Sequence, residues 1–146
     1  MPASATRSSG VEGPTGVLST PDGVAGLLAE PHHDTGPAHL VGERAPGAEL
    51  TARLWVPAAR RPERVLLRQV IDGEPVFSPL ARVGSTPAGA WWEGAVRLVN
   101  PINRYRFLLL TPGEREPCTW YHAAGTADHD VPDSTDFAVL APSPWM

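Results

Sequence analysis

The sequence has no lysine and only one cysteine, and both features narrow the range of functions. All 12 basic residues are arginine, and 16 acidic residues outnumber them, which gives a formal charge of −4. Nucleic-acid-binding domains use a basic surplus to pair with phosphates, so nucleic acid is not expected as a partner. Cys118 has no second cysteine for an internal disulfide, and no zinc-ligand pattern surrounds it. Neither a disulfide scaffold nor a zinc module is supported.

Long apolar runs are also missing. No window approaches the roughly 20 apolar residues that a membrane span needs. Residues 1–28 lack a charged start followed by a sustained apolar stretch, which a secretory signal would need. We therefore expect a cytoplasmic protein that makes no membrane contact.

Proline and glycine divide the chain into three parts. Residues 1–26 are rich in Ser, Gly and Pro, cannot bury enough apolar surface to offset the entropy of ordering, and are expected to be a disordered tail. Residues 27–141 carry most of the apolar content and are expected to form a single domain. Residues 142–146 contain two prolines and are typical of a linker.

Short apolar–polar alternations, separated by turn residues, predict an all-β domain. Residues 49–56 alternate with a period of two, and Asp72-Gly73 predicts a hairpin turn after the strand at 64–71. A loop is expected at 84–89. Further strands are expected at 91–99, 104–110, 118–121 and 136–140, and no segment shows a sustained helical period. Short strands at this spacing favour a β-sandwich of immunoglobulin-like architecture.

Three segments resemble a known module. They are the strand at Trp91-Trp92, the run Asn103-Arg104-Tyr105-Arg106-Phe107, and the stretch from Asp128-His129-Asp130 to Asp136-Phe137. Together they are similar to the N-terminal domain of family 13 glycoside hydrolases of the neopullulanase, cyclomaltodextrinase and maltogenic amylase type. This domain is often classed as a family 34 carbohydrate-binding module. The resemblance covers residues 27–145 and includes the Pro144-Trp145 step, which in the family leads to the catalytic (β/α)8 barrel.

The resemblance implies an accessory β-sandwich that helps to bind α-glucans of the starch, maltodextrin or cyclodextrin type. A barrel needs at least about 200 residues, and no residue here matches the family's catalytic carboxylate motifs. We therefore expect a domain that is not an enzyme on its own, with no cofactor, and with an α-glucan and the parent's barrel as partners. The alternative is a structural or dimerisation domain that docks on the barrel or on a second subunit without binding sugar.

Exposed aromatic rings would be needed to stack on a pyranose ring. Neighbouring strand residues face opposite ways, so we expect Trp92 in the core and Trp91 on the outer face. Trp55 is the second candidate platform. The candidate carbohydrate-binding residues are Trp91, Trp55, Arg53, Glu93 and Arg97. The alternative is that Trp55 and Trp91 pack under loops or against the parent's barrel.

Two polar groups allow a metal interpretation, but simpler ones are favoured. Asp128-His129-Asp130, with Asp133 and Asp136, could ligate a metal, although turn residues capping backbone amides before the last strand explain the same pattern. His32-His33-Asp34 could bind a metal or act as acid and base, but a polar loop is the preferred interpretation. No metal ligand is therefore assigned.

Overall fold

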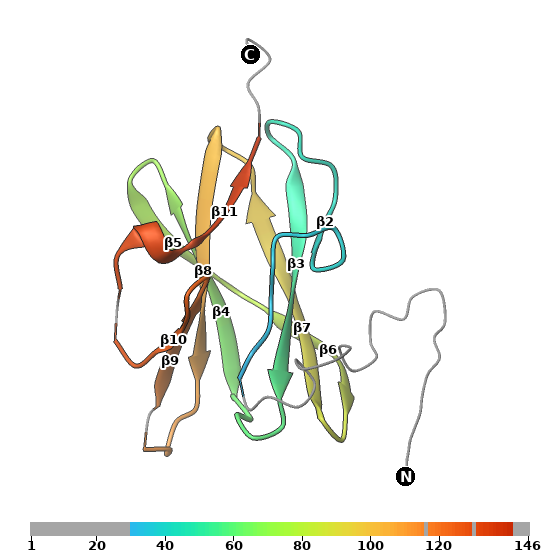
Figure 1. The fold of residues 1–146 in the computed structure, drawn as a ribbon, viewed down its shortest axis with the longest axis vertical. Helices are drawn as coiled ribbons and strands as arrows, with labels where there is room; N and C mark the ends of the chain where they lie inside the picture. Colours follow the sequence, from blue (N-terminus) through green and yellow to red (C-terminus); the bar gives the residue numbers. More distant parts are fainter. Residues whose placement is uncertain (1–29, 116, 130, 142–146) are drawn as a thin grey trace.

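A computed structural model describes residues 30–115, 117–129 and 131–141. They form two packed antiparallel sheets (Figure 1). The larger sheet has the strand order β10-β9-β8-β4-β5, with β11 also pairing with β8, and the smaller sheet has the order β2-β3-β7-β6. The prediction of an all-β sandwich is confirmed. The predicted tail, residues 1–26, and the predicted linker, residues 142–146, lie outside the described residues.

The strand bounds follow the turn residues of the sequence. The larger sheet contains β4 (Arg64–Ile71), β5 (Glu74–Pro79), β8 (Ile102–Leu110), β9 (Cys118–His122), β10 (Gly125–Ala127) and β11 (Phe137–Leu140). The smaller sheet contains β2 (Leu40–Val41), β3 (Glu49–Pro57), β6 (Ala81–Thr86) and β7 (Gly89–Arg97). A short 3-10 helix, Asp133–Thr135, precedes β11. Figure 1 shows the chain crossing from the larger to the smaller sheet between β5 and β6.

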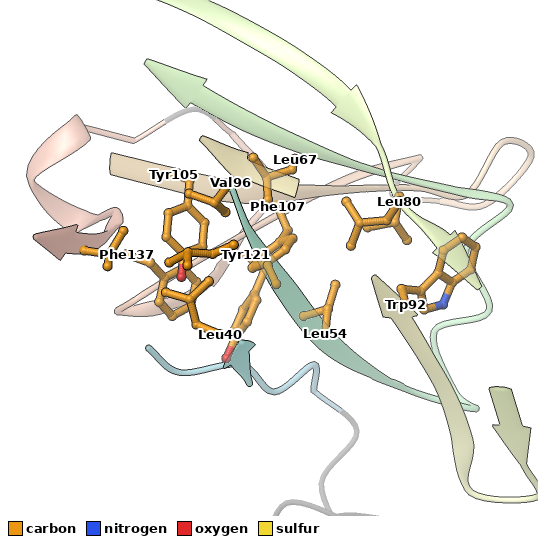
Figure 2. Packing of buried hydrophobic residues seen from close by; sticks show 14 of the residues in the cluster. Leu40, Leu54, Leu67, Leu80, Trp92, Val96, Tyr105, Phe107, Tyr121 and Phe137 are labelled. Carbon is orange, nitrogen blue, oxygen red and sulfur yellow. The ribbon is translucent and has the colours of Figure 1, made fainter. Parts of the chain in front are cut away.

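The hydrophobic core lies between the sheets and is built from alternate residues of each strand. In β3 the inward residues are those that the alternation predicts, and in β7 Trp92 faces the core as expected. Figure 2 shows Leu54 of β3 near the aromatic residues of β8 and β9, and Trp92 beside Leu80. Fully buried members from the central strands include Leu50, Ala52, Leu54, Val65, Leu67, Tyr105, Phe107 and Leu109. Burial of such side chains is the main favourable term in folding.

The β4–β5 hairpin is confirmed. Its two-residue turn consists of Asp72 and Gly73, whose φ angles are 54° and 79°. A turn with positive φ at both central residues matches the right-handed twist of the paired strands and favours the Asp-Gly dipeptide. This turn places Phe77 opposite Arg68 on the neighbouring strand.

The loop expected at 84–89 is wrong except at Pro87 and Ala88, because Gly89 already belongs to β7. Gly84, Ser85 and Thr86 belong to β6 and pair with β7, after a register shift between Arg82 and Gly84. A two-residue connection is sufficient to join the strands, because Thr86 Oγ1 accepts a hydrogen bond from the backbone N–H of Ala88 at 3.1 Å. Glycine, serine and threonine here mark an irregular edge strand and not a loop.

Candidate functional site

The two tryptophans expected to form an exposed platform are buried. Trp55 is 0% exposed and Trp91 is 4% exposed, and their ring centroids lie 5.3 Å apart. The His39 ring stacks on Trp91 at 5.7 Å, while the backbone of His32 exchanges two hydrogen bonds with that of Trp55. The expected exposure is therefore wrong, and the alternative of packing under a loop is correct. Alternation correctly places both rings outside the core, but it does not show that the segment 32–39 covers them.

The charged candidates on the same face are paired with each other. Arg53 and Glu93 lie directly opposite in the β3–β7 register, and Arg53 Nε donates to Glu93 Oε2 at 2.9 Å. Arg97 is exposed at the end of β7. The structure thus brings four of the five predicted residues together, but as a covered layer and not as an open sugar-binding surface.

His33 anchors the covering segment to both sheets. It is 3% exposed, and its Nδ1 lies 2.8 Å from the carbonyl oxygen of Arg53. A carbonyl only accepts, so Nδ1 carries the proton and Nε2 accepts from the Tyr105 hydroxyl at 2.7 Å. The backbone N–H of His33 donates to the Tyr121 hydroxyl at 3.0 Å. Burial lowers the pKa of His33 to about 4, so the imidazole is neutral at physiological pH.

A second group of polar side chains lies within the segment 32–39. His32, Asp34 and His39 each place one nitrogen or oxygen atom within 4.8 Å of the others. His39 Nδ1 lies 3.3 Å from Asp34 Oδ1, and His32 Nε2 lies 3.6 Å from Asp34 Oδ2. Burial lowers the pKa of His32 and the charge of His39 lowers it further, which favours neutral imidazole. When each imidazole carries its proton on the other ring nitrogen, His32 Nε2, His39 Nδ1 and the Asp34 carboxylate offer lone pairs that can bind a cation.

The outer face of the larger sheet presents two aromatic rings. Phe77 on β5 is 46% exposed, and Trp120 on β9 is half-buried, with ring centroids 6.3 Å apart. The Arg106 guanidinium lies 5.5 Å from the centroid of the Trp120 ring. Half-buried Leu66 and Leu108 pair in register on the two strands between the rings. This face therefore presents aromatic and aliphatic surface, with the Arg106 guanidinium buried against the Trp120 ring.

An ion-pair network lies on this face, where the sequence suggested turn caps. Arg106 is fully buried and its Nε donates to Asp136 Oδ1 at 2.5 Å, while Arg106 Nη2 donates to Asp133 Oδ1 at 3.2 Å. Arg68 Nη1 also donates to Asp133 Oδ1. Burial raises the pKa of Asp136, although the hydrogen bond and charge of Arg106 act in the opposite direction. The aspartates at 133 and 136 thus bind arginines, and the 3-10 helix has no side-chain cap.

Exposed apolar side chains gather at the end of the sandwich where the described chain finishes. Ile102 and Leu140 are opposite each other on β8 and β11 and are 49% and 62% exposed, and Val99 nearby is 46% exposed. A surface hollow beside them is lined by Pro46, Gly47, Leu98, Val99, Asn100, Pro101 and Ala141. Figure 1 shows this end at the top of the molecule.

The comparisons with known proteins show the fold. The structure is similar to a cyclomaltodextrinase, with a TM-score of 0.64 and 15% sequence identity. The match covers 80% of this chain and 20% of the cyclomaltodextrinase chain, so this chain spans about a fifth of that protein. No family model matches the sequence, and no curated protein matches it. Within the described residues, no helix is long and apolar enough to cross a membrane.

Three features of the candidate sites do not follow from the sequence. Trp120 was placed on a strand without a role, Phe77 was treated only as part of a hairpin, and His39 was not connected with His32 and Asp34. The Phe77–Trp120 pair could not be found from spacing, because 43 residues separate them and three strand pairings bring them together. The pattern His-x-Asp-x4-His was the available signal for the histidine group.

Proposed function

We propose that this domain is a non-catalytic accessory module of an α-glucan-acting glycoside hydrolase, and that it assists glucan binding. The observation that carries the proposal is the fold similarity itself, because it includes most of this chain but a fifth of a cyclomaltodextrinase chain. An additional domain in the parent protein would then carry the catalytic residues. The accessory domain corresponds to residues 27–141.

The glucan would bind on the outer face of the larger sheet. Pyranose rings pack their apolar faces on aromatic side chains, and polar groups beside the rings bond the hydroxyls. Phe77 and Trp120 supply the aromatic surface, while Asp133, which is 51% exposed at its side chain, supplies carboxylate oxygens nearby. Trp55 and Trp91 are not part of this site, since both side chains are buried.

We predict that the double substitution of Phe77→Ala and Trp120→Ala weakens starch binding at least several-fold, because both stacking surfaces are removed. Affinity electrophoresis in gels of increasing starch content measures the effect as a loss of retardation. Val83→Ala is the matched control, since Val83 is 40% exposed on β6 of the other sheet. Far-UV circular dichroism checks that each variant remains folded.

Retardation of the wild-type protein and the control, together with its loss in the double variant, would support the proposal. Equal retardation of all three proteins would place glucan binding elsewhere on the domain. No retardation of the wild-type protein at any starch content would contradict glucan binding by this domain.

The apolar end of the sandwich favours a second candidate function, which is docking on another folded body. Val99, Ile102 and Leu140 are exposed large apolar side chains beside a hollow, and such patches are typical of interaction surfaces. The occupant in this proposal is the parent enzyme's barrel or a second subunit.

If this surface mediates docking on a second subunit, the domain alone should associate with itself at high concentration. We predict that Leu140→Arg shifts sedimentation velocity profiles toward the monomer, because a charge in an apolar interface is costly to desolvate. Starch retardation should stay unchanged in the same variant. Phe77→Ala is the control, because it changes the proposed glucan-binding face and leaves the apolar end intact. Its sedimentation should match that of the wild-type protein. A monomeric wild-type protein at all concentrations would contradict self-association through this end.

A further inference from the structure

We propose that His32, Asp34 and His39 form a binding site for a divalent transition-metal ion, of which zinc is the best match. The proposal does not depend on glucan binding, because these residues lie on the smaller sheet, away from Phe77 and Trp120. It assigns a role to His32, Asp34 and His39 in addition to the link that His33 makes between the two sheets.

The distances within the group fit a tetrahedral ion. Zinc binds imidazole nitrogen and carboxylate oxygen at about 2.0–2.2 Å, which places neighbouring ligand atoms of a tetrahedron roughly 3.3–3.6 Å apart. His39 Nδ1 is 3.3 Å from Asp34 Oδ1, and His32 Nε2 is 3.6 Å from Asp34 Oδ2. All three donors lie within 4.8 Å of one another. The two shorter distances reach different oxygens of the Asp34 carboxylate, so the side chains must adjust for one of its oxygens and the two imidazoles to close around an ion.

The main chain holds the two histidines in place without a metal. His32 exchanges hydrogen bonds of 2.9 Å with the backbone of Trp55, and the backbone N–H of Arg53 donates to the carbonyl oxygen of His39 at 2.7 Å. Residues 53 and 55 are two apart on the same strand, so β3 fixes the spacing of the histidines. Binding would then lose less entropy than at a site made of free loop residues.

The carboxylate is also positioned. Asp34 Oδ1 accepts a hydrogen bond of 2.9 Å from the backbone N–H of Gly36, which orients the side chain toward the histidines. The His39 ring is held by its stacking on Trp91. Such outer contacts orient ligands in known metal sites, and their loss weakens binding.

The donor set selects the class of ion. Calcium takes six to eight oxygen ligands and magnesium requires mainly oxygen, whereas two imidazoles and one carboxylate suit zinc and its neighbours. The side chains of His32 and Asp34 are 35% and 55% exposed, so water can occupy a fourth position. Among the described residues, this is the group of three ligand-bearing side chains that lies close enough to hold an ion.

Zinc binding is tested by isothermal titration of untagged, metal-free protein with zinc chloride. We expect one ion for each chain, and we expect Asp34→Asn and His32→Asn each to reduce the affinity at least about tenfold, as even outer-contact losses do in known sites. Asp34→Asn retains an oxygen for the Gly36 N–H and should fold normally. His129→Asn is the matched control, because His129 also pairs with an aspartate, Asp128, at 2.9 Å but has no third ligand among the residues that the structure describes.

Cobalt provides an independent measurement of geometry. Visible absorption of the cobalt-loaded protein should show the intense bands of a four-coordinate ion, and Asp34→Asn should remove them while His129→Asn keeps them. The proposal is overturned if the wild-type protein binds no zinc, if its affinity is unchanged in both Asp34→Asn and His32→Asn, or if His129→Asn abolishes binding. A six-coordinate cobalt spectrum that all variants share would equally reject this site.

Discussion

Replacing Arg106 by alanine is expected to lower the free energy of unfolding by about 3–5 kcal/mol, the range observed when one partner of a buried ion pair is removed. Arg106 and Asp136 both have side chains that are 0% exposed, and they are joined through Arg106 Nε and Asp136 Oδ1. The substitution leaves a buried carboxylate without its main counter-charge. It also removes the guanidinium that packs on Trp120. Urea denaturation at neutral pH measures the change.

Arg68 can reduce the loss of stability in Arg106→Ala. Its Nη1 lies 3.7 Å from Asp136 Oδ2 and can partly replace the lost charge. Arg82→Ala is the control, since Arg82 is exposed and surface substitutions usually change stability by no more than about 0.5 kcal/mol. A loss below about 1 kcal/mol for Arg106→Ala would mean that Arg68 alone neutralises Asp136.

A double variant shows whether the loss of unfolding free energy in Arg106→Ala comes from the unpaired Asp136 carboxylate. Arg106→Met with Asp136→Leu removes both charges, and replacing a buried ion pair by apolar residues is often neutral or stabilising. We expect this double variant to be more stable than Arg106→Ala. An equal or greater loss would show that packing, and not the unpaired carboxylate, dominates.

The face of each strand residue could be predicted from the sequence, but what covers that face could not. Alternation places Trp55 and Trp91 on the outer face of the smaller sheet, which is correct. Both are nevertheless buried. The His39 ring stacks on Trp91, and the backbone of His32 pairs with that of Trp55, although both histidines lie some 20 residues earlier in the chain. Arg106 shows the same limit, since it points outward from β8 and is still fully buried under Asp136 and Trp120. Whether an outward-facing side chain is buried depends on tertiary contacts, which the alternation of residues along one strand does not encode.

The Asp72-Gly73 turn was predicted correctly from its residue types, whereas Gly84, Ser85 and Thr86, which also suggest a loop, belong to a strand. The positive φ angles at Asp72 and Gly73 require residues that tolerate them, so the dipeptide itself carries the information. The candidate sites depend on pairing across the sheets. Phe77 approaches Trp120 only after β4 and β8 have been placed between them, and His39 approaches His32 only after both have paired with β3. Composition could therefore indicate the types of residue in a site but not their partners.

Acidification from pH 7 to pH 4 should destabilise the fold through His33. Its pKa is about 4 when folded, because burial opposes the charged form, against 6.5 when exposed. Between these values the unfolded chain binds one more proton than the folded chain, so stability rises with pH and falls on acidification. The loss from this residue reaches about 3 kcal/mol by pH 4, from a shift of about 2.5 pKa units at 1.36 kcal/mol each.

The contribution of His33 to the pH dependence of stability is the difference in unfolding free energy between the wild-type protein and His33→Gln. His33→Gln removes the titration and keeps an amide that can donate to the carbonyl of Arg53, so its unfolding free energy should fall less steeply between pH 6.5 and pH 4. His32, Asp34, His122 and Asp136 also titrate with shifted pKa values, but they are present in both proteins. Parallel curves for the two proteins would contradict the prediction. A gap that widens to about 3 kcal/mol toward pH 4 would identify the neutral His33 imidazole, hydrogen-bonded to Arg53 and Tyr105, as the acid-sensitive link between the two sheets.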